Sequence, residues 1–394
     1  MPPNGSEPAA APKAVAPLGI YAHFPFCSVR CTYCDFPTVA GQDGRIAAYL
    51  DALAAEIETF QPEAQGAADT IFFGGGTPSR MSPGQAARVL AAIRARFDVA
   101  EGAEVTLEGN PESLDRRSLA GFREAGITRI SVGMQSLSDA VLKGAGRAHD
   151  ARQALDAIQE AREAGFGRVS LDLIAGLPGE DLAAWPDTVR RAAAAAPDHV
   201  SVYLLESDKD TPLGRAVRSG RLVVAGDDAM AATYEQTVTV LEREGFPLYE
   251  ISNFAAPGRR SLHNLKYWTD APYAGFGLGA HAYVLGKRRA NRRDLDGYIA
   301  DVAAGKDPLD WEEPYDRDRR LEEALFLGLR VVEGVDLVEL GARYGADLRA
   351  RHAEAWDRGT EAGLIVWDGE RVRLTPSGRV RSNELFSELI GHAA

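Results

Sequence analysis

Residues 27–34 read Cys27-Ser28-Val29-Arg30-Cys31-Thr32-Tyr33-Cys34 and contain all three cysteines of a 394-residue chain. Cysteines that form a disulfide framework would come in an even number and be spread along the sequence. Intervals of three and two residues let a looped backbone turn three thiolates toward one point, and such thiolates bind zinc or an iron–sulfur cluster. A cluster held by three cysteines leaves one iron for an exchangeable ligand. The alternative is a structural zinc site that His23 completes as a Cys3His set.

The cysteine stretch follows a short apolar segment at residues 18–23, and similar segments recur at intervals of roughly 30 residues. We expect the five later strands at residues 69–73, 104–107, 129–132, 168–174 and 199–205. Helical patterns separate the strands, with Ser82-Pro83 and Ser113 at two expected helix starts. This alternation predicts an α/β fold with a parallel sheet, open or barrel-like.

Polar residues and glycines follow the predicted strands at the same end, which in (β/α) barrels carries the active site. They are the three cysteines, Gly74-Gly75-Gly76-Thr77, Glu108, Gln135, Asp172 and Glu206. The glycines suit close approach of a ligand to the backbone, although a tight turn explains them equally well. Asp172 interrupts an apolar strand and is either functional or tied into a structural hydrogen bond. Arg147 could bind a carboxylate or cap a helix.

The bulk composition limits the classes of function. A net charge of −13 and a pI near 5.1 argue against a chain-wide nucleic-acid surface. No apolar run reaches membrane-spanning length. Residues 1–17 are rich in Pro and Ala, lack a signal-peptide core and are expected to be disordered. Reduced cysteines without an export signal predict a cytoplasmic protein. The basic residues 287–289 and 292–293 form either a solvated link or a contact for propionates or anionic lipid.

The later chain contains two further patterns. His263-Asn264-Leu265-Lys266-Tyr267-Trp268 places a histidine beside two aromatic residues, which suits an axial heme ligand or a packed loop with a satisfied histidine. Beyond residue 315, helices precede two short strands joined by Asp368-Gly369, a strong hairpin signal. This order predicts a small winged-helix-like α+β domain.

Taken together, these residues resemble the radical S-adenosylmethionine (SAM) superfamily, in the branch of oxygen-independent coproporphyrinogen dehydrogenases and the heme chaperone HemW group. The motif Tyr21-x-His23-x-Pro25-Phe26-Cys27-x3-Cys31-x2-Cys34 carries the resemblance, which extends to Leu374-Thr375-Pro376-x-Gly378. It implies a partial (β/α)6 barrel at residues 18–210, a connecting region with the histidine motif at 211–310, and a C-terminal domain at 311–394.

The resemblance also implies the ligands of the site. A [4Fe-4S] cluster would lie on Cys27, Cys31 and Cys34, with SAM on the free iron through its amino and carboxylate groups. The SAM contacts carried over by position are Tyr21, Gly75, Gly76, Thr77, Glu108, Gln135, Arg147 and Asp172. Within this set we expect Arg147 on the carboxylate and Asp172 on the ribose. Tyr33 would neighbour the adenine.

Two features favour the chaperone group within this branch. The dehydrogenases have a fourth cysteine two residues after the third, and Phe36 occupies that place here. His263-Asn264-x-x-Tyr267-Trp268 matches a motif of the HemW group for which heme binding has been proposed, so we expect heme on His263. The resemblance thus implies heme binding and transfer to respiratory acceptor proteins, with peripheral membrane contact as an option. The alternative is oxidative decarboxylation of coproporphyrinogen III through reductive cleavage of SAM. Nucleic-acid binding through the C-terminal hairpin is disfavoured by the acidic balance.

Overall fold

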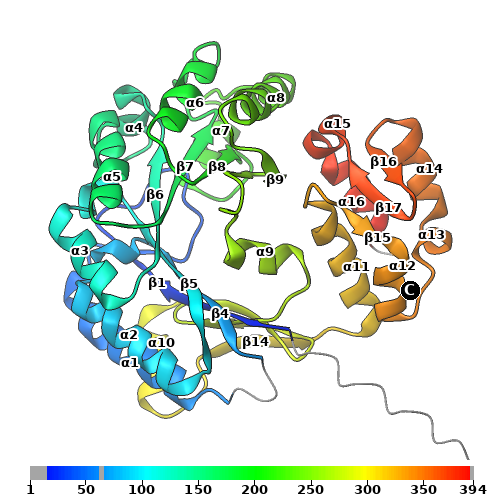
Figure 1. Ribbon diagram of the computed structural model, residues 1–394. Coiled ribbons are helices and arrows are strands. Elements are labelled where there is room, and N and C mark those ends of the chain that lie inside the picture. Colours follow the sequence, from blue (N-terminus) through cyan, green and yellow to red (C-terminus); the bar gives the residue numbers. More distant parts are fainter. Residues whose placement is uncertain (1–15, 62–65, 391–394) are drawn as a thin grey trace, which may run out of the picture.

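The computed structural model describes residues 16–61 and 66–390 (Figure 1). Most of the predicted disordered tail, residues 1–15, lies outside this part. Six parallel strands form the centre of one curved sheet, in the order in which they occur along the chain. They are β1 (Leu18–Phe24), β4 (Ala68–Gly75), β5 (Val99–Gly109), β6 (Arg129–Gln135), β7 (Arg168–Ala175) and β8 (His199–Leu204). The predicted α/β fold with a partial (β/α)6 barrel is therefore confirmed.

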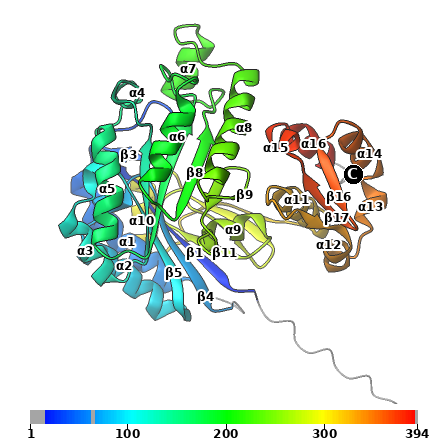
Figure 2. The same ribbon diagram turned by 45° about the horizontal axis from the view of Figure 1, so that its top comes forward.

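Helices cover the outer face of these strands (Figure 2). They are α1 (Ile46–Thr59), α2 (Pro83–Arg96), α3 (Arg116–Ala125), α5 (Ala151–Glu163) and α6 (Trp185–Ala194), with short 3₁₀ turns at Asp43–Arg45, Pro78–Arg80 and Pro111–Ser113. Helix α4 (Asp139–Gly144) belongs instead to a small separate cluster at the end of β7. Ser82 begins α2 with a capping box, as predicted. The prediction for Ser113 is wrong, because this residue ends a 3₁₀ turn and the side chain of Asp115 caps α3 instead.

Alternation along the strands separates an apolar outer face from a polar inner face. Ile20, Ile71 and Ile130 point outward into the core beneath the helices and are fully buried. The inner face carries Tyr21 and His23 of β1, Thr70 and Phe72 of β4, Glu104, Thr106 and Glu108 of β5, Arg129 and Ser131 of β6, Ser170 and Asp172 of β7, and His199 and Ser201 of β8. Such a lining suits a site rather than a closed apolar core.

Antiparallel strands extend the sheet at both edges, using the segment predicted to connect the two domains. Beside β8 lie β10 (Asn253–Ala255) and β9 (Leu248–Glu250), and beside β1 lie β11 (Tyr273–Phe276), β12 (His281–Val284), β13 (Lys287–Asn291) and β14 (Leu309–Pro314). The helices of this segment are α7 (Pro212–Arg218), α8 (Asp227–Arg243), α9 (Leu262–Trp268) and α10 (Leu295–Ala303). Only β11 within this edge runs parallel to its neighbour β1.

A buried carboxylate fixes α1 to this extended edge. Glu56 accepts hydrogen bonds from the N–H of Gly277 at 2.8 Å, from Asn291 Nδ2 at 2.6 Å and from the hydroxyl of Tyr298 at 2.6 Å. Burial raises the pKa of Glu56, and the three donors act in the opposite direction. The network joins α1, the end of β11, β13 and α10 at one point.

The C-terminal residues form a separate core beside the sheet (Figure 1). Its elements are α11 (Arg317–Leu329), β15 (Val335–Asp336), α12 (Leu337–Tyr344), α13 (Leu348–Arg351), α14 (Ala353–Glu361), β16 (Ile365–Asp368), β17 (Arg371–Leu374), α15 (Pro376–Val380) and α16 (Ser382–Leu389). The predicted hairpin is present as β16 and β17, with Gly369 at φ 62° in its turn. The smaller α+β unit expected after the barrel is thus found.

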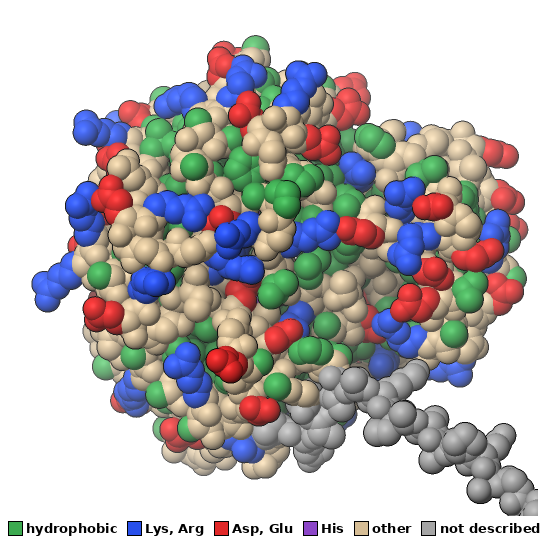
Figure 3. All heavy atoms as spheres, viewed as in Figure 1, with side chains coloured by type: hydrophobic (Ala, Val, Ile, Leu, Met, Phe, Trp, Pro, Cys, Tyr) green, Lys and Arg blue, Asp and Glu red, His purple; other side chains and the backbone are tan. Residues whose placement is uncertain are grey.

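Ion pairs join the two parts of the chain. Arg288 of β13 pairs with Glu323 of α11 at 2.6 Å, and Arg260 pairs with Glu333 at 2.6 Å. Figure 3 shows hydrophobic side chains exposed along the line where the C-terminal unit meets the sheet, with Lys and Arg around them. None of the helices in the described residues has both the length and the apolar character needed to cross a lipid bilayer.

Candidate functional site

The three cysteines lie in the loop that follows β1, and none of them forms a disulfide. Cys27 ends β2 (Phe26–Cys27), which pairs with β3 (Val39–Ala40) and closes the loop at its base. Cys34 donates its N–H to the carbonyl of Cys31 at 3.3 Å. Thr32 between them bonds through its N–H to a carbonyl just after α4 and through its carbonyl to an N–H of α7. The loop is therefore held at its base and its tip.

Two polar side chains contact the sulfurs. The hydroxyl of Thr77 donates to Cys27 Sγ at 3.5 Å, and Arg147 Nη1 donates to Cys31 Sγ at 3.5 Å. Burial raises the pKa of the Cys27 thiol and raises that of Cys34 to about 11. Because only thiolates bind metals well, a donor hydroxyl and a guanidinium beside the sulfurs favour the ligand form.

The triple glycine after β4 packs directly against the cysteine loop. A Cβ on Gly76 would lie 2.6 Å from the carbonyl oxygen of Pro25 and 3.0 Å from Cys27 Sγ. Gly75 has a φ of 116°, and a Cβ there would lie within 2.7 Å of three atoms of the His23 ring. Both positions therefore require glycine, because the cysteine loop packs directly against this backbone. The close approach of a ligand to the same glycines stays a prediction.

Two carboxylates face the inside of the barrel beneath this loop. Glu108 accepts the N–H of Gly75 at 3.2 Å, and Asp172 accepts the hydroxyl of Ser131 at 3.2 Å. Burial, reinforced by the charge of Asp172, raises the pKa of Glu108 to about 8. Burial also raises the pKa of Asp172, while Arg129 favours the ionised form of both groups. Two carboxyls in a site of this kind suit the hydroxyl or ammonium groups of a ligand.

Arg147 joins the cysteine loop to the next strands. Its Nη2 donates to Asn110 Oδ1 at 2.7 Å and to the carbonyl of Gly133 at 2.9 Å. Its Nε is buried without a partner among the described residues. Gln135 nearby has a φ of 67°, a conformation that non-glycine residues adopt mostly where the surroundings require it. The guanidinium is therefore oriented but retains hydrogen-bonding capacity.

The two predicted tyrosines take different places. Tyr21 donates or accepts a hydrogen bond with His23 Nδ1 at 2.9 Å and stacks on Phe72, with ring centroids 6.2 Å apart. Tyr33 packs against a small apolar cluster made by α4 and the end of β7. Burial raises the pKa of both phenols, so both are neutral at physiological pH. Tyr33 thus provides an aromatic, apolar wall beside the cysteines.

His23 is engaged elsewhere and does not complete a Cys3His zinc set in this structure. Its Nδ1 bonds to Tyr21 and its Nε2 lies 3.0 Å from the carbonyl oxygen of Pro37. Burial lowers the pKa of His23 to about 4, so the ring is neutral. No three His, Cys, Asp or Glu side chains of residues 16–61 and 66–390 are grouped to hold a single ion. A four-iron cluster differs, because each thiolate binds its own iron.

His263, the predicted heme ligand, lies apart from the cysteines on α9, which crosses the inner side of the sheet (Figure 1). It is fully buried, with its ring stacked on Phe72 at 5.1 Å. Both ring nitrogens make hydrogen bonds, one with Thr70 at 2.9 Å and one with the hydroxyl of Tyr267 at 2.9 Å. Burial lowers its pKa to about 3. That His263 binds heme stays a prediction, and one that requires α9 to move.

The structure adds residues that were not singled out from the sequence. Asn110 holds Arg147 and also donates from Nδ2 to Thr77 at 3.3 Å. The sequence feature that could have identified Asn110 is its position two residues after Glu108, at the end of a strand. Arg129 is 3% exposed, and its guanidinium makes no hydrogen bond or ion pair within the described part of the chain. Alternation in Arg129-Ile130-Ser131-Val132 puts Arg129 on the same face as Ser131, but it does not tell which face lines the site.

These residues fit a [4Fe-4S] cluster and SAM. The thiols are free, and their loop is closed by backbone bonds. The cradle formed by Gly75 and Gly76 has no room for a Cβ against His23, Pro25 and Cys27 Sγ. The orphaned Nε of Arg147 suits the carboxylate of an amino acid. Thr77 lies beside Cys27, and the side chains of Gln135 and Arg147 both lie beside Gly133. Tyr21 lies on the inner face of β1, and contact of these residues with SAM stays a prediction.

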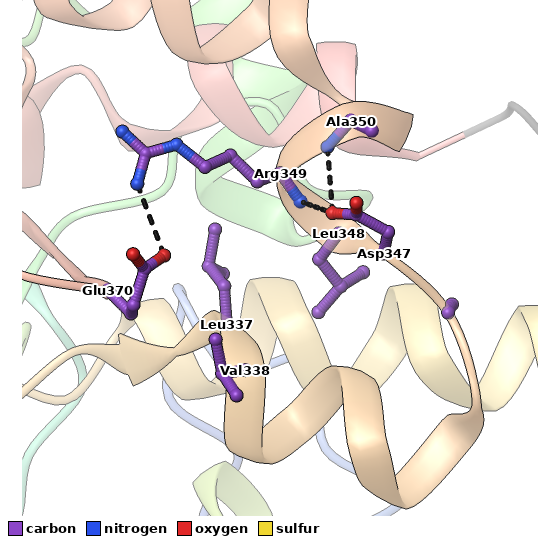
Figure 4. Close-up of a pocket in the computed structure, with 8 residues that line it drawn as sticks. Leu337, Val338, Asp347, Leu348, Arg349, Ala350 and Glu370 are labelled. Carbon is purple, nitrogen blue, oxygen red and sulfur yellow. Dashed lines mark hydrogen bonds and ion pairs between the residues drawn. The ribbon is translucent and has the colours of Figure 1, made fainter.

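A second hollow lies on the C-terminal unit and lacks such features (Figure 4). Its volume is about 610 Å³, and Leu337, Val338 and Leu348 form much of its wall. The charged groups at its rim are paired with each other or with backbone, as in the 3.1 Å contact of Arg349 with Glu370. It contains neither cysteine nor histidine, so the cysteine loop is the candidate site.

Comparisons with known proteins agree with this geometry. The profile of the Radical SAM superfamily matches residues 21–192, and that of the HemN C-terminal domain matches residues 315–381. Coproporphyrinogen III oxidase (HemN) from Escherichia coli, described as a radical SAM enzyme, superposes with a TM-score of 0.84 at 22% identity, over 95% of this chain and 90% of that one. At this identity the match establishes the fold.

Curated relatives extend the match in sequence. Heme chaperone HemW of Bacillus subtilis (strain 168) is 35% identical over 94% of this chain and 98% of its own length. Heme chaperone HemW of Mycobacterium tuberculosis (strain H37Rv) is 37% identical over 98% of this chain and 97% of its own. The radical SAM superfamily implies a [4Fe-4S] cluster and SAM, which the cysteine loop and its surroundings fit. The chain belongs to the HemW family of the radical SAM superfamily.

Proposed function

We propose that this protein is a heme chaperone that binds heme, carries a [4Fe-4S] cluster and SAM, and transfers heme to acceptor proteins. The observation that carries the proposal is the near full-length similarity to proteins named heme chaperone HemW. Respiratory heme proteins are the proposed acceptors, and the cytoplasm is the proposed location.

Cys27, Cys31 and Cys34 would hold the cluster, and the glycine cradle with Thr77 would hold the methionine end of SAM. When bound, these groups supply one-electron reductive cleavage chemistry. The chain's own part is positioning. Arg147 lies between Cys31 and Asn110, where it can orient a carboxylate. Seven further residues are proposed to contact SAM: Tyr21, Tyr33, Gly75, Gly76, Glu108, Gln135 and Asp172.

The inner face controls the charge of this site. Glu108 of β5 and Asp172 of β7 lie on this face, and the charge of Arg129 lowers the pKa of both carboxyls. The charge of Arg147 also lowers the pKa of Asp172. A cationic or hydroxyl-bearing ligand would favour the ionised carboxylates and release a proton at Glu108. Tyr33 and its apolar neighbours exclude water from one side of the cysteine loop.

The second candidate function is coproporphyrinogen dehydrogenation. The sequence argues against it at one position, because Phe36 stands where the dehydrogenases have a fourth cysteine. The side chain of Phe36 is 59% exposed beside the cysteine loop, so the residue is not needed for the core. An exposed aromatic ring here suits contact with an apolar ligand or partner.

Of the two routes to a membrane, the basic run and a partner protein, we propose the partner protein. Four cations of the basic run are paired with carboxylates: Lys287 with Glu312, Arg288 with Glu323, Arg289 with Asp307, and Arg292 with Asp294 and Asp301. A run that is largely neutralised offers little attraction to anionic lipid.

The test uses anaerobically reconstituted full-length protein. Heme is titrated while the Soret band is recorded, and the loaded protein is then mixed with an apo acceptor heme protein. In parallel, coproporphyrinogen III is incubated with protein, SAM and reductant, and porphyrin products and 5′-deoxyadenosine are measured. Heme binding and transfer without porphyrin conversion support the proposal. Conversion that is lost in Cys31→Ala makes the protein a dehydrogenase, and absence of heme binding overturns the proposal.

A further inference from the structure

The accessibility of the histidines singles out one residue. The side chains of His23, His149, His199, His263 and His352 are at most 4% exposed. His281 alone among the histidines in the described part of the chain is open to solvent. Its ring makes no hydrogen bond or ion pair with any described residue. It is therefore the imidazole that can bind an external metal without breaking existing hydrogen bonds or moving a helix.

The strand geometry places His281 beside the candidate site. Gly275 of β11 pairs with Tyr21 of β1 on one side and is approached by the start of β12 on the other. A Cβ on Gly275 would lie 2.0 Å from the backbone oxygen of His281, so only glycine allows this approach. His281 thus lies two strands from Tyr21, roughly 10 Å at the usual spacing of strands. Both lie toward the end of the sheet where the cysteine loop leaves β1.

An aromatic side chain borders the imidazole. His281 pairs with Ala290 of β13, and Ala290 pairs with Trp311 of β14, so the two rings lie on one face across a small residue. Their centroids are 5.7 Å apart with the planes at 73°. Trp311 is 39% exposed, unusually open for an indole on a sheet. Together they form an exposed apolar and nitrogen-donor surface.

Charge complements this surface. Arg293 is exposed and, unlike Arg292 before it, has no carboxylate partner in the described residues. A Cβ on Gly279 would lie 2.8 Å from Pro37 Cγ and 3.5 Å from Arg293 Cγ, which places Arg293 beside the segment that follows the cysteine loop. Burial, together with the charges of Arg293 and Arg288, lowers the pKa of His281, so its ring is neutral and keeps a free lone pair at neutral pH.

We propose that His281 is the axial ligand of bound heme, with Trp311 against the edge of the macrocycle and Arg293 on a propionate carboxylate. A neutral imidazole can bind the iron, an aromatic plane can pack against the macrocycle, and an unpaired guanidinium can bind a propionate. The site rests on the proposed heme function. The proposed ligand differs from His263, which the sequence motif predicts as the heme ligand. Both ring nitrogens of His263 already make hydrogen bonds.

The experiment is a titration of full-length, cluster-loaded protein with ferric heme, read by the Soret band and by the electron paramagnetic resonance spectrum of the iron. In His281→Ala the dissociation constant rises by about tenfold or more, and the spectrum of imidazole ligation is lost. In His281→Met binding is retained with a changed spectrum. Free imidazole added to His281→Ala restores the original spectrum.

Matched variants separate the possible outcomes. Arg293→Gln weakens heme binding several-fold, whereas Arg292→Gln, which removes a cation already paired with carboxylates, does not. A wild-type spectrum and affinity in His281→Ala overturns the inference, and so does loss of imidazole ligation in His263→Ala with His281 intact and an unchanged thermal midpoint. In both cases the wild-type protein still binds heme, so the proposed function stands. If the wild-type protein binds no heme, the proposed function and the inference fall together.

Discussion

Arg147 Nη1 lies 3.5 Å from the sulfur of Cys31, while the same guanidinium donates from Nη2 to Asn110 at 2.7 Å. One side chain therefore connects the cysteine loop to the loop after β5, although 116 residues separate Arg147 from Cys31. In the proposed contact with the SAM carboxylate, the planar guanidinium donates two parallel hydrogen bonds. The ammonium group of a lysine cannot replace this geometry.

We expect Arg147→Lys to raise the dissociation constant of SAM by about tenfold or more, since a bidentate contact is lost. Iron content should stay at the wild-type level. Equilibrium dialysis with reconstituted protein measures the first quantity, and iron analysis the second. Arg30→Lys is the matched control, because Arg30 is an exposed arginine of the same loop, and its one side-chain hydrogen bond within residues 16–61 and 66–390 goes to the carbonyl of Cys34. Unchanged SAM affinity in Arg147→Lys would contradict the assignment.

Gly76→Ala should impair cluster assembly. The added methyl would meet Pro25 and Cys27 Sγ at 2.6 and 3.0 Å, and overpacking of this kind costs about 1–3 kcal/mol. Iron per chain after reconstitution and the thermal midpoint should both fall. Gly44→Ala is the control, because nothing lies within 4 Å of its Cβ position. If both variants take up iron equally, the cradle does not shape the cysteine loop.

Glu108 predicts a pH dependence of stability. Its pKa in the folded protein is about 8, above the ordinary value of 4.5, so the folded state binds the proton more tightly. This group therefore stabilises the fold below about pH 4.5 and loses that contribution as the pH rises through about 8. The thermal midpoints of Glu108→Gln and the wild type are measured without SAM at pH 5.5 and at pH 8.5. The midpoint of the variant minus that of the wild type should rise by about 2 °C or more between these two pH values. Glu101→Gln, at the exposed start of the same strand, should show no such trend.

Glu56→Ala should destabilise the protein by about 3 kcal/mol, because it leaves three buried donors without an acceptor. Urea unfolding monitored by tryptophan fluorescence measures the loss. Glu58→Ala on the exposed side of the same helix is the control and should stay within about 0.5 kcal/mol of the wild type. Equal effects of the two changes would show that the network does not hold α1 to β13 and α10.

Much of the barrel could be predicted because its strands are apolar runs that end in glycine or polar residues. The loop with Cys27 and the cradle at Gly75 have local signatures of spacing and composition. Ser113 was misplaced as a cap, since Asp115 two residues later satisfies the helix N-terminus better. A local sequence pattern cannot decide which of two nearby residues, both able to cap a helix, does so.

Other features depend on packing that no local pattern contains. The burial of His263 follows from α9 crossing the inner face, and the approach of the His281 backbone to β11 requires the glycine at position 275. Arg129 points inward only because of the register of β6. Strands β11 to β14 are only four to six residues long and lack a sustained apolar alternation, so their place beside β1 could not be read from periodicity.

The pairing of β1 with β11 has a consequence for folding during synthesis on the ribosome. Gly19 and Tyr273 are partners in the sheet, so about two thirds of the polypeptide must be synthesised before β1 gains its second neighbour. Until then β1 is an unpaired edge next to the cysteine loop, and Glu56 lacks the donors that β11, β13 and α10 provide. Cluster insertion into a settled loop therefore requires the chain to be synthesised beyond Tyr298, and nascent chains arrested before residue 273 should not retain iron.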